Sequence, residues 1–172
     1  FLNLLGYNQE QKTEQQNNQS QRLSRLSKKH VLIAEDNMVN QMVIKGMLKK
    51  LKVSFDIASD GVEAFDNIKQ HHEKYDAVLM DCEMPNMDGY DATIAIRSWE
   101  QEHNELPLPI IALTAHAMKE RLDKAITSGM NSHLVKPIEI EGLRNCLEIH
   151  ILENQEKEST SSFQPQGAEK KL

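Results

Sequence analysis

Five short apolar runs, each followed by a helix-like segment, constrain the fold of this chain most strongly. The runs cover residues 30–35, 53–58, 75–80, 109–113 and 132–135. Their length and their Val, Ile and Leu content are typical of strands buried on both faces. Helical patterns follow over residues 38–51, 61–72, 89–102, 117–128 and 138–152. This alternation predicts an α/β fold with a parallel sheet and right-handed crossovers.

Polar residues stand at the carboxyl ends of four of these runs. Glu35 and Asp36 end the first run, Asp81 follows the third, Thr114 the fourth and Lys136 the fifth. In open parallel sheets, ligands bind at the edge formed by the carboxyl ends of the strands. We therefore expect these five side chains to converge on one binding edge.

Carboxylates gathered at one edge repel one another. At a separation of about 4 Å and an effective dielectric of about 20, each pair costs about 4 kcal/mol. A cation among Glu35, Asp36 and Asp81 would offset this repulsion, and a few carboxylates with waters suit Mg²⁺ better than an all-protein Ca²⁺ cage. Without metal, removal of Glu35 or Asp36 is therefore expected to stabilise the fold.

Asp81 is also a candidate nucleophile, since carboxylates form aspartyl phosphates in known enzymes. Lys136 would supply a compact positive charge, and Thr114 a hydroxyl donor, to a transferred phosphoryl group. Each feature alone has a simpler explanation, because acidic residues and Thr favour helix N-termini and a Lys-Pro pair is typical of a solvated strand end. Their combination at the strand ends favours a phosphoryl site.

Two sequence segments carry a more specific pattern: AEDNMVNQ at residues 34–41 and MDCEMP at residues 80–85. With the polar strand ends, they resemble the receiver domain of two-component response regulators, and most of all the receivers of hybrid sensor histidine kinases. The resemblance covers residues 29–152. It implies a flavodoxin-like, doubly wound (βα)5 fold with five parallel strands in the order 2-1-3-4-5. It also implies a phosphorelay, in which Asp81 accepts a phosphoryl group from a phosphohistidine.

The resemblance assigns roles to the acidic residues. Asp81 matches the phosphoacceptor, and Glu35 and Asp36 match the acidic pair that holds Mg²⁺ beside it. The backbone carbonyl of Glu83 completes the protein ligands. A Glu-Asp pair stands where Asp-Asp is commoner, and the longer side chain should still bind metal. Glu83 and His116 match positions that tune the lifetime of the phosphoryl group.

The remaining site positions lie on the last two predicted strands. Thr114 and Lys136 match the hydroxyl and the ammonium that contact the phosphoryl group. His133 stands where an aromatic switch residue, working with Thr114, usually lies. The simpler interpretation of His133 is a buried or half-buried packing residue. Pro137 matches a proline that follows a cis peptide bond.

The first predicted helix offers a candidate partner surface. One stripe at a spacing of four residues is expected to face the sheet, and it consists of Val39, Val43, Met47 and Leu51. Met38 and Met42 lie beside this stripe. Methionine is common at adaptable binding surfaces, and in hybrid-kinase receivers this helix docks a histidine phosphotransfer domain. The alternative is that both methionines fill the edge of the core.

Composition divides the chain into three parts. Residues 1–28 are predicted to be a flexible linker or the tail of a preceding domain, residues 29–152 the receiver domain, and residues 153–172 a flexible C-terminal segment. The chain begins with Phe1, which suggests a piece of a larger protein. The expected partners are a histidine kinase core, in the same polypeptide, and a histidine phosphotransfer domain.

Charge and cysteine content exclude several functions. A formal net charge of −6 at pH 7 argues against nucleic-acid binding. No apolar run reaches about 18 residues, so we expect no membrane contact by this segment. Cys82 and Cys146 lack the spacing of a metal site and favour a reducing, cytoplasmic location, with an inner-membrane anchor in the parent chain left open. Cys82 is expected to pack against a helix.

Three other classes of protein share parts of this pattern. An aspartate-nucleophile phosphatase of the haloacid dehalogenase type needs a second aspartate two residues after the nucleophile, where this chain has Glu83. A flavodoxin-like cofactor binder needs a phosphate loop and stacking aromatics, and the aromatic content is only 5%. A stand-alone or truncated response regulator stays open.

Overall fold

The sheet is fully parallel. The structure, a computed structural model, describes residues 25–153. Its strands are β1 (His30–Ala34), β2 (Ser54–Ala58), β3 (Ala77–Asp81), β4 (Ile110–Thr114) and β5 (Ser132–Val135). They pair in the order β2-β1-β3-β4-β5. The predicted flavodoxin-like, doubly wound fold is confirmed, and every strand end lies within about two residues of its predicted position.

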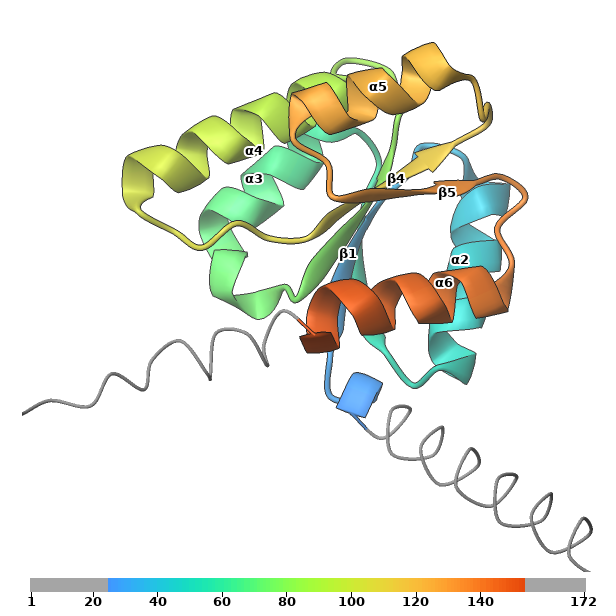
Figure 1. Ribbon diagram of the computed structural model, residues 1–172. Coiled ribbons are helices and arrows are strands. Elements are labelled where there is room, and N and C mark those ends of the chain that lie inside the picture. Colours follow the sequence, from blue (N-terminus) through green and yellow to red (C-terminus); the bar gives the residue numbers. More distant parts are fainter. Residues whose placement is uncertain (1–24, 154–172) are drawn as a thin grey trace, which may run out of the picture.

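Helices cover both faces of the sheet (Figure 1). They are α2 (Met38–Lys50), α3 (Gly61–His71), α4 (Gly89–His103), α5 (Lys119–Ser128) and α6 (Ile140–Leu147). A 3-10 turn, η1 (His72–Lys74), follows α3, and a π-helical turn, η2 (Glu148–Glu153), continues α6. Helices α2 and α6 lie on one face, while α3, α4 and α5 lie on the other.

Two apolar cores lie between the sheet and its helices, one on each face of the sheet. Successive strand side chains point to opposite faces, so Val31 and Ile33 of β1 pack toward α2 and α6, whereas Leu32 and Ala34 pack toward α3 and α4. Every residue of the central strand β3 is buried. Asp81, at the end of this strand, is therefore a carboxylate placed at the rim of an otherwise apolar layer.

Local sequence signals set the helix starts around this rim. Asn37 caps α2 by accepting hydrogen bonds from the Val39 and Asn40 amides. Asp60 caps α3 and Asp88 caps α4, each by accepting a hydrogen bond from a backbone amide of the first turn. At Gly89 a side chain is impossible, because an added Cβ would lie 2.1 Å from the backbone oxygen of Asp81. This close approach brings the start of α4 against the end of β3.

The predicted core-facing stripe of α2 was wrong at two of its four positions. Val39 and Val43 are exposed at 67% and 47%, whereas Leu51 is buried and Met47 packs against the core, as predicted. The helix buries Gln41, Ile44 and Leu48 in place of the two valines. Apolar residues occur on every side of this helix, so the sequence supports two different stripes. The side chain of Gln41 donates a hydrogen bond to the Glu35 carbonyl at 2.7 Å, which turns that side of the helix inward.

The described fold begins upstream of the boundary predicted at residue 29. Leu26, assigned to the linker, is completely buried and packs in the core beside α6 and η2. The other residues of the predicted linker and C-terminal segment, 1–24 and 154–172, lie outside the described part of the chain.

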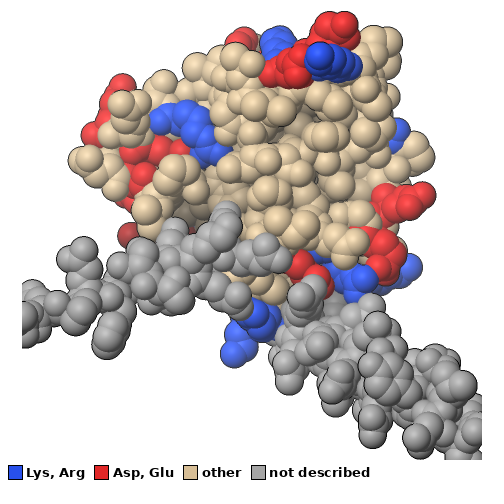
Figure 2. Space-filling model, viewed as in Figure 1, with Lys and Arg blue, Asp and Glu red and all other residues tan. Residues whose placement is uncertain are grey.

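Several smaller expectations concern individual residues. Cys82 and Cys146 are both free and buried, and burial raises the pKa of each thiol. The peptide bond between Lys136 and Pro137 is cis, as the resemblance implied. Within residues 25–153, no helix is long and apolar enough to cross a membrane. The face carrying β5, seen in Figure 2, shows few charged side chains at its centre and both signs at its rim.

Candidate active site

The strand register brings the predicted site residues to one level of the sheet. Ala34 is paired with Met80, so the next residues along these two strands, Glu35 and Asp81, lie side by side. Thr114 is paired with Val135, and the amide of Lys136 donates to the Thr114 carbonyl at 2.8 Å. The carboxyl ends of β1, β3, β4 and β5 therefore form the edge that the sequence predicted.

Three carboxylates converge at this edge. Glu35, Asp36 and Asp81 each offer an oxygen, and these oxygens lie within 4.8 Å of one another. Glu35 has no exposed surface and Asp81 is 5% exposed, whereas Asp36 is open to solvent. A hard cation with bound waters fits this donor set, because it would meet two fixed oxygens on the protein side and an accessible one on the solvent side.

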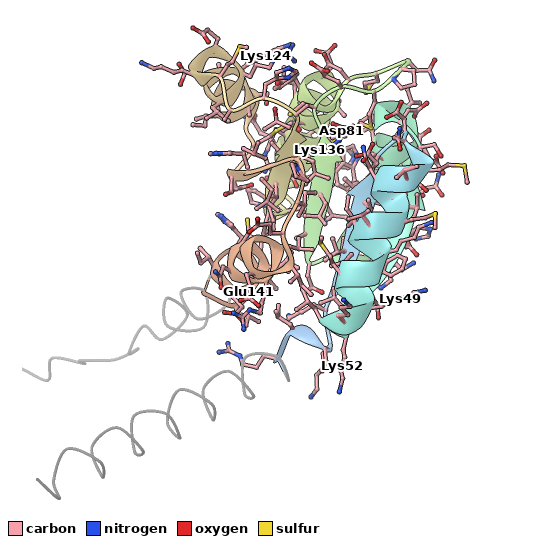
Figure 3. The ribbon with its side chains drawn as sticks, turned by 90° about the vertical axis from the view of Figure 1, so that its right-hand side faces the viewer. Lys49, Lys52, Asp81, Lys124, Lys136 and Glu141 are labelled. Carbon is pink, nitrogen blue, oxygen red and sulfur yellow. The ribbon has the colours of Figure 1, made fainter. Side chains whose placement is uncertain are left out.

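Lys136 is the cation that contacts the buried carboxylates. Its ammonium lies 2.7 Å from Oε2 of Glu35 and 2.9 Å from Oδ2 of Asp81, and Figure 3 shows Lys136 and Asp81 side by side. Burial alone would lower the pKa of the ammonium, but its hydrogen bonds to the two carboxylates reverse the effect and raise it. Lys136 is therefore charged at neutral pH.

Glu35 is held by groups that the sequence reasoning missed. Its Oε1 accepts hydrogen bonds from the Asn40 side chain at 3.0 Å and from the Asn37 amide at 3.2 Å. Its backbone carbonyl accepts from Gln41. These residues follow Glu35 by two, five and six positions at the start of α2. That spacing is a usable signal only once the start of the helix is known.

The carboxyl of Asp81 is buried beside another carboxylate, Glu35, and beside the Lys136 ammonium. Burial raises the pKa of its carboxyl from 3.8 to about 6, and the neighbouring Glu35 adds to the rise while Lys136 opposes it. The ionised form is thus disfavoured in the absence of metal. A cation placed among the carboxylates would lower this pKa and restore a full negative charge to Asp81.

An open cleft of about 430 Å³ adjoins the carboxylates. Its lining includes charged residues from the loops after β1 and β3 and from α5: Asp36, Glu83, Asp88, Arg121 and Lys124. Arg121 of α5 forms an ion pair with Glu83, across the mouth of the cleft. The ammonium of Lys124 lies 4.0 Å from the centre of the Tyr90 ring and 3.8 Å from Asp88. No motif in the sequence pointed to these two basic residues.

The two predicted switch residues, Thr114 and His133, differ in burial. Thr114 is buried, and its hydroxyl donates to the His116 carbonyl at 3.0 Å while accepting from the His116 amide at 3.2 Å. His133 is exposed on the edge strand β5, so it is not the buried or half-buried packing residue of the simpler interpretation. β5 is the last strand of the sheet, where cover by the helices is incomplete, and no residue of this strand is fully buried.

The sequence of the described domain matches a known protein family. The model of the response regulator receiver domain matches residues 31–148. This chain belongs to the response regulator receiver family. As a receiver, it is similar to parts of histidine kinases: 43% identical over 122 residues to Probable histidine kinase 2 of Oryza sativa subsp. indica, with 64% of this chain matched.

A second relative is Hybrid signal transduction histidine kinase I of Dictyostelium discoideum, 41% identical over 143 residues and 81% of this chain. The match spans only 12% of the rice kinase and 8% of the Dictyostelium protein. The receiver is thus similar to a small part of much longer kinases.

Two solved structures are similar to this receiver. One is the receiver domain of the sensor histidine kinase PA1611 from Pseudomonas aeruginosa PAO1, with a magnesium ion in the active-site cleft. It is 39% identical with a TM-score of 0.63, over 72% of this chain and 97% of that one. The other is a co-crystal structure from Saccharomyces cerevisiae, which holds the histidine phosphotransfer protein Ypd1 and the receiver domain of its downstream response regulator Ssk1. The matched chain of that structure is 30% identical with a TM-score of 0.69, over 73% of this chain and 90% of that one.

Proposed function

We propose that this receiver accepts a phosphoryl group on Asp81 from a phosphohistidine, in a Mg²⁺-dependent reaction, and relays it to a histidine phosphotransfer partner. The convergence of Asp81 with two further carboxylates and the Lys136 ammonium carries this proposal. Family membership supports it, since receivers act in two-component phosphorelays. The histidine kinase relatives favour a hybrid kinase as the parent chain, with the kinase core in the same polypeptide.

In the proposed reaction, an Asp81 carboxylate oxygen forms a bond to phosphorus as the bond from phosphorus to the imidazole nitrogen breaks. The electron pair of that bond stays on the departing ring nitrogen, and the imidazole leaves in its neutral form because its other ring nitrogen carries a proton. Lys136 contacts a phosphoryl oxygen and offsets the charge that gathers there. To do so it shifts away from Asp81, and it keeps its contact with Glu35. The Thr114 hydroxyl turns from His116 to donate to a second oxygen.

The residues fit one divalent metal ion. Glu35, Asp36 and Asp81 would hold Mg²⁺, with the Glu83 backbone carbonyl as the remaining protein ligand. When bound, Mg²⁺ neutralises the carboxylates and the transferring phosphoryl group. Asn40 and the Asn37 amide orient Glu35 for this role, through their hydrogen bonds to its other oxygen.

The partner surface proposed here lies on α2, beside the site. Met38 and Met42 are exposed at 75% and 69%, so they do not fill the core edge, which was the alternative. With the exposed Val39 and Val43 they form an apolar surface on the first two turns of α2, directly after the metal-binding residues. A partner helix bundle docked there could bring its histidine to Asp81. The Ypd1–Ssk1 complex supports this kind of partner for a receiver of similar fold.

Phosphotransfer from a phosphorylated histidine phosphotransfer domain tests the proposal. Ypd1 and several bacterial and plant domains, loaded with labelled phosphate, are mixed with the chain with and without Mg²⁺. We expect Mg²⁺-dependent transfer to the chain from at least one of them, and none to Asp81→Asn. Transfer to Asp81→Asn at the same rate, or no transfer from any donor, would overturn the proposed function.

A further inference from the structure

Gly46 lies in the middle of α2 without any structural need for glycine. A Cβ added there would have no heavy atom within 4 Å, and the residue is exposed. Gly61 and Gly89 differ, since an added Cβ would clash with backbone oxygens at 2.5 and 2.1 Å. Gly129 has a φ of 103°. Because glycine is less stable than alanine inside a helix, Gly46 costs stability that the fold does not recover.

Helical geometry places Gly46 at the centre of the exposed face of α2. Residues three and four positions away are its neighbours on the helix surface. They are Met42 and Val43 on one side and Lys49 and Lys50 on the other. All four are exposed, and the buried residues Gln41, Ile44 and Leu48 lie on the opposite side. Gly46 is thus a notch between an apolar turn and a basic turn.

The two turns differ in their distance from the active site. Figure 3 shows Asp81 near one end of α2 and Lys49 and Lys52 near the other. The apolar turn is the one nearer Asp81. At 1.5 Å per residue, the notch lies about 12 Å along the axis from the first residue of the helix. The exposed face of α2 therefore changes from apolar to cationic with distance from the site. Gly46, which has no side chain, lies at the boundary between the two parts.

We infer that Gly46 is the point at which a helix of the histidine phosphotransfer partner crosses α2 most closely. Apolar side chains of that helix pack on Met42 and Val43, and acidic side chains face Lys49 and Lys50. The inference rests on the proposed function, and it adds the position and the charge of the partner helix. Two helices pack with axes 8–10 Å apart depending on the side chains between them, so a missing side chain permits the closest approach.

This position has a consequence for phosphotransfer. A side chain at residue 46 would push the partner helix outward and move its histidine away from Asp81. A misplacement of about 1 Å in a reacting pair can lower the rate by about 100-fold. Glycine at position 46 thus favours docking although it lowers the stability of the fold. Substitution of Gly46 by alanine should therefore raise Tm and lower the rate of phosphotransfer.

Three variants test the inference: Gly46→Ala, Gly46→Leu and the matched control Gly142→Ala. Gly142 is an exposed helical glycine on α6, where an added Cβ would make one ordinary contact of 3.8 Å with Leu134. Thermal unfolding of the full 172-residue chain is measured for each. The rate of transfer from the fastest phosphohistidine donor is divided by the rate of phosphorylation by acetyl phosphate. Damage to the active site lowers both rates and therefore does not change their ratio.

We expect both alanine variants to raise Tm by about 2–6 °C. Gly142→Ala should leave the rate ratio unchanged. Gly46→Leu should lower it about 10- to 100-fold, with Gly46→Ala in between. Replacement of both Lys49 and Lys50 by Glu should lower the ratio at low salt and lose this effect at high salt.

The outcomes separate the inference from the proposed function. If Gly46→Leu keeps the ratio of the unmodified chain while Met42→Glu lowers it, the partner docks on α2 but does not cross at Gly46, and the inference fails alone. If neither changes the ratio, the partner docks elsewhere, and both the α2 surface and the inference are overturned. If Gly142→Ala lowers the ratio as much as Gly46→Ala, the effect does not come from the notch.

Discussion

Lys136 and Glu35, 101 residues apart in sequence, form an ion pair of 2.7 Å in which the carboxylate has no exposed surface. A buried carboxylate of this kind is costly unless a cation and hydrogen bonds compensate it. In this receiver the same lysine also contacts Asp81. Lys136 therefore stabilises the metal-free site, in addition to its proposed contact with the phosphoryl group.

Replacement of Lys136 by Met should destabilise the metal-free protein. It leaves Glu35 and Asp81 buried without their counter-charge, and loss of one partner of a buried ion pair costs about 3–5 kcal/mol. Since Lys136 keeps some exposure, we expect about 3 kcal/mol in urea unfolding with a chelator present. Lys124→Met is the control, because its pair with Asp88 is long and exposed and should contribute less than about 1 kcal/mol. Equal effects of the two substitutions would contradict the stabilising role of Lys136.

Glu35 and Asp36 should differ in their effect on stability. Repulsion among carboxylates, the only consideration available from the sequence, predicts that removal of either stabilises the metal-free fold. In the structure Glu35 is paired with Lys136 and hydrogen-bonded to Asn40, while Asp36 is exposed. We expect Glu35→Ala to be destabilising and Asp36→Ala to be neutral or stabilising, although both weaken Mg²⁺ binding. Unfolding with chelator and titration with Mg²⁺ measure the two effects, and similar destabilisation by both changes would refute the distinction.

The stability of the metal-free protein should depend on the ionisation of Asp81. Burial raises the pKa of this carboxyl from 3.8 to about 6, so between these pH values the folded state holds a proton that the unfolded state has released. Stability therefore falls as pH rises from about 3.8 to about 6. A difference of about two between the pKa values corresponds to about 3 kcal/mol.

Asp81→Asn removes this ionisation. It should stabilise the metal-free protein by up to about 3 kcal/mol near neutral pH, and the gain should disappear below the lower of the two pKa values. Saturating Mg²⁺ should reverse the order of the two proteins. Unfolding curves recorded across this pH range check the prediction, and a gain that stayed constant with pH would show that Asp81 is not the titrating group.

Met42→Glu should separate docking from chemistry. The side chain is exposed on α2, so the substitution should change stability by less than about 0.5 kcal/mol. We expect slower transfer from a phosphohistidine donor and nearly unchanged phosphorylation by acetyl phosphate. If both rates fall together, Met42 has a structural role. If neither falls, the exposed face of β5 that carries His133 becomes the leading candidate for docking.

The sequence alone predicted which residues stand at the strand ends, because few alternative registers bury every apolar run in a parallel sheet. Asp81, Thr114 and Lys136 each end an apolar run, and parallel strands bring such ends together whatever the details of the loops. The side of α2 that faces the sheet could not be predicted in this way. Val43 and Ile44 are equally apolar neighbours, and only tertiary contacts decide which of them is buried.

The residues that contact the site residues could not be predicted from the sequence either. The contact of Asn40 with Glu35 depends on how α2 leaves the sheet, and the pair of Arg121 with Glu83 joins elements 38 residues apart. Neither contact follows from spacing or hydrophobic pattern. The exposed position of His133 depends on β5 being an edge strand, which follows from the strand order that the resemblance implied, but not from the sequence around His133.

Direct identification of the phosphorylated residue tests the central claim most directly. The chain is treated with acetyl phosphate and Mg²⁺, its intact mass is measured after acid quenching, and the modified residue is located by reduction with borohydride and peptide sequencing. We predict one added phosphoryl group, located at residue 81, dependent on Mg²⁺ and absent from Asp81→Asn. Modification of another residue, or equal uptake by Asp81→Asn, would contradict the assignment of Asp81 as the phosphoacceptor.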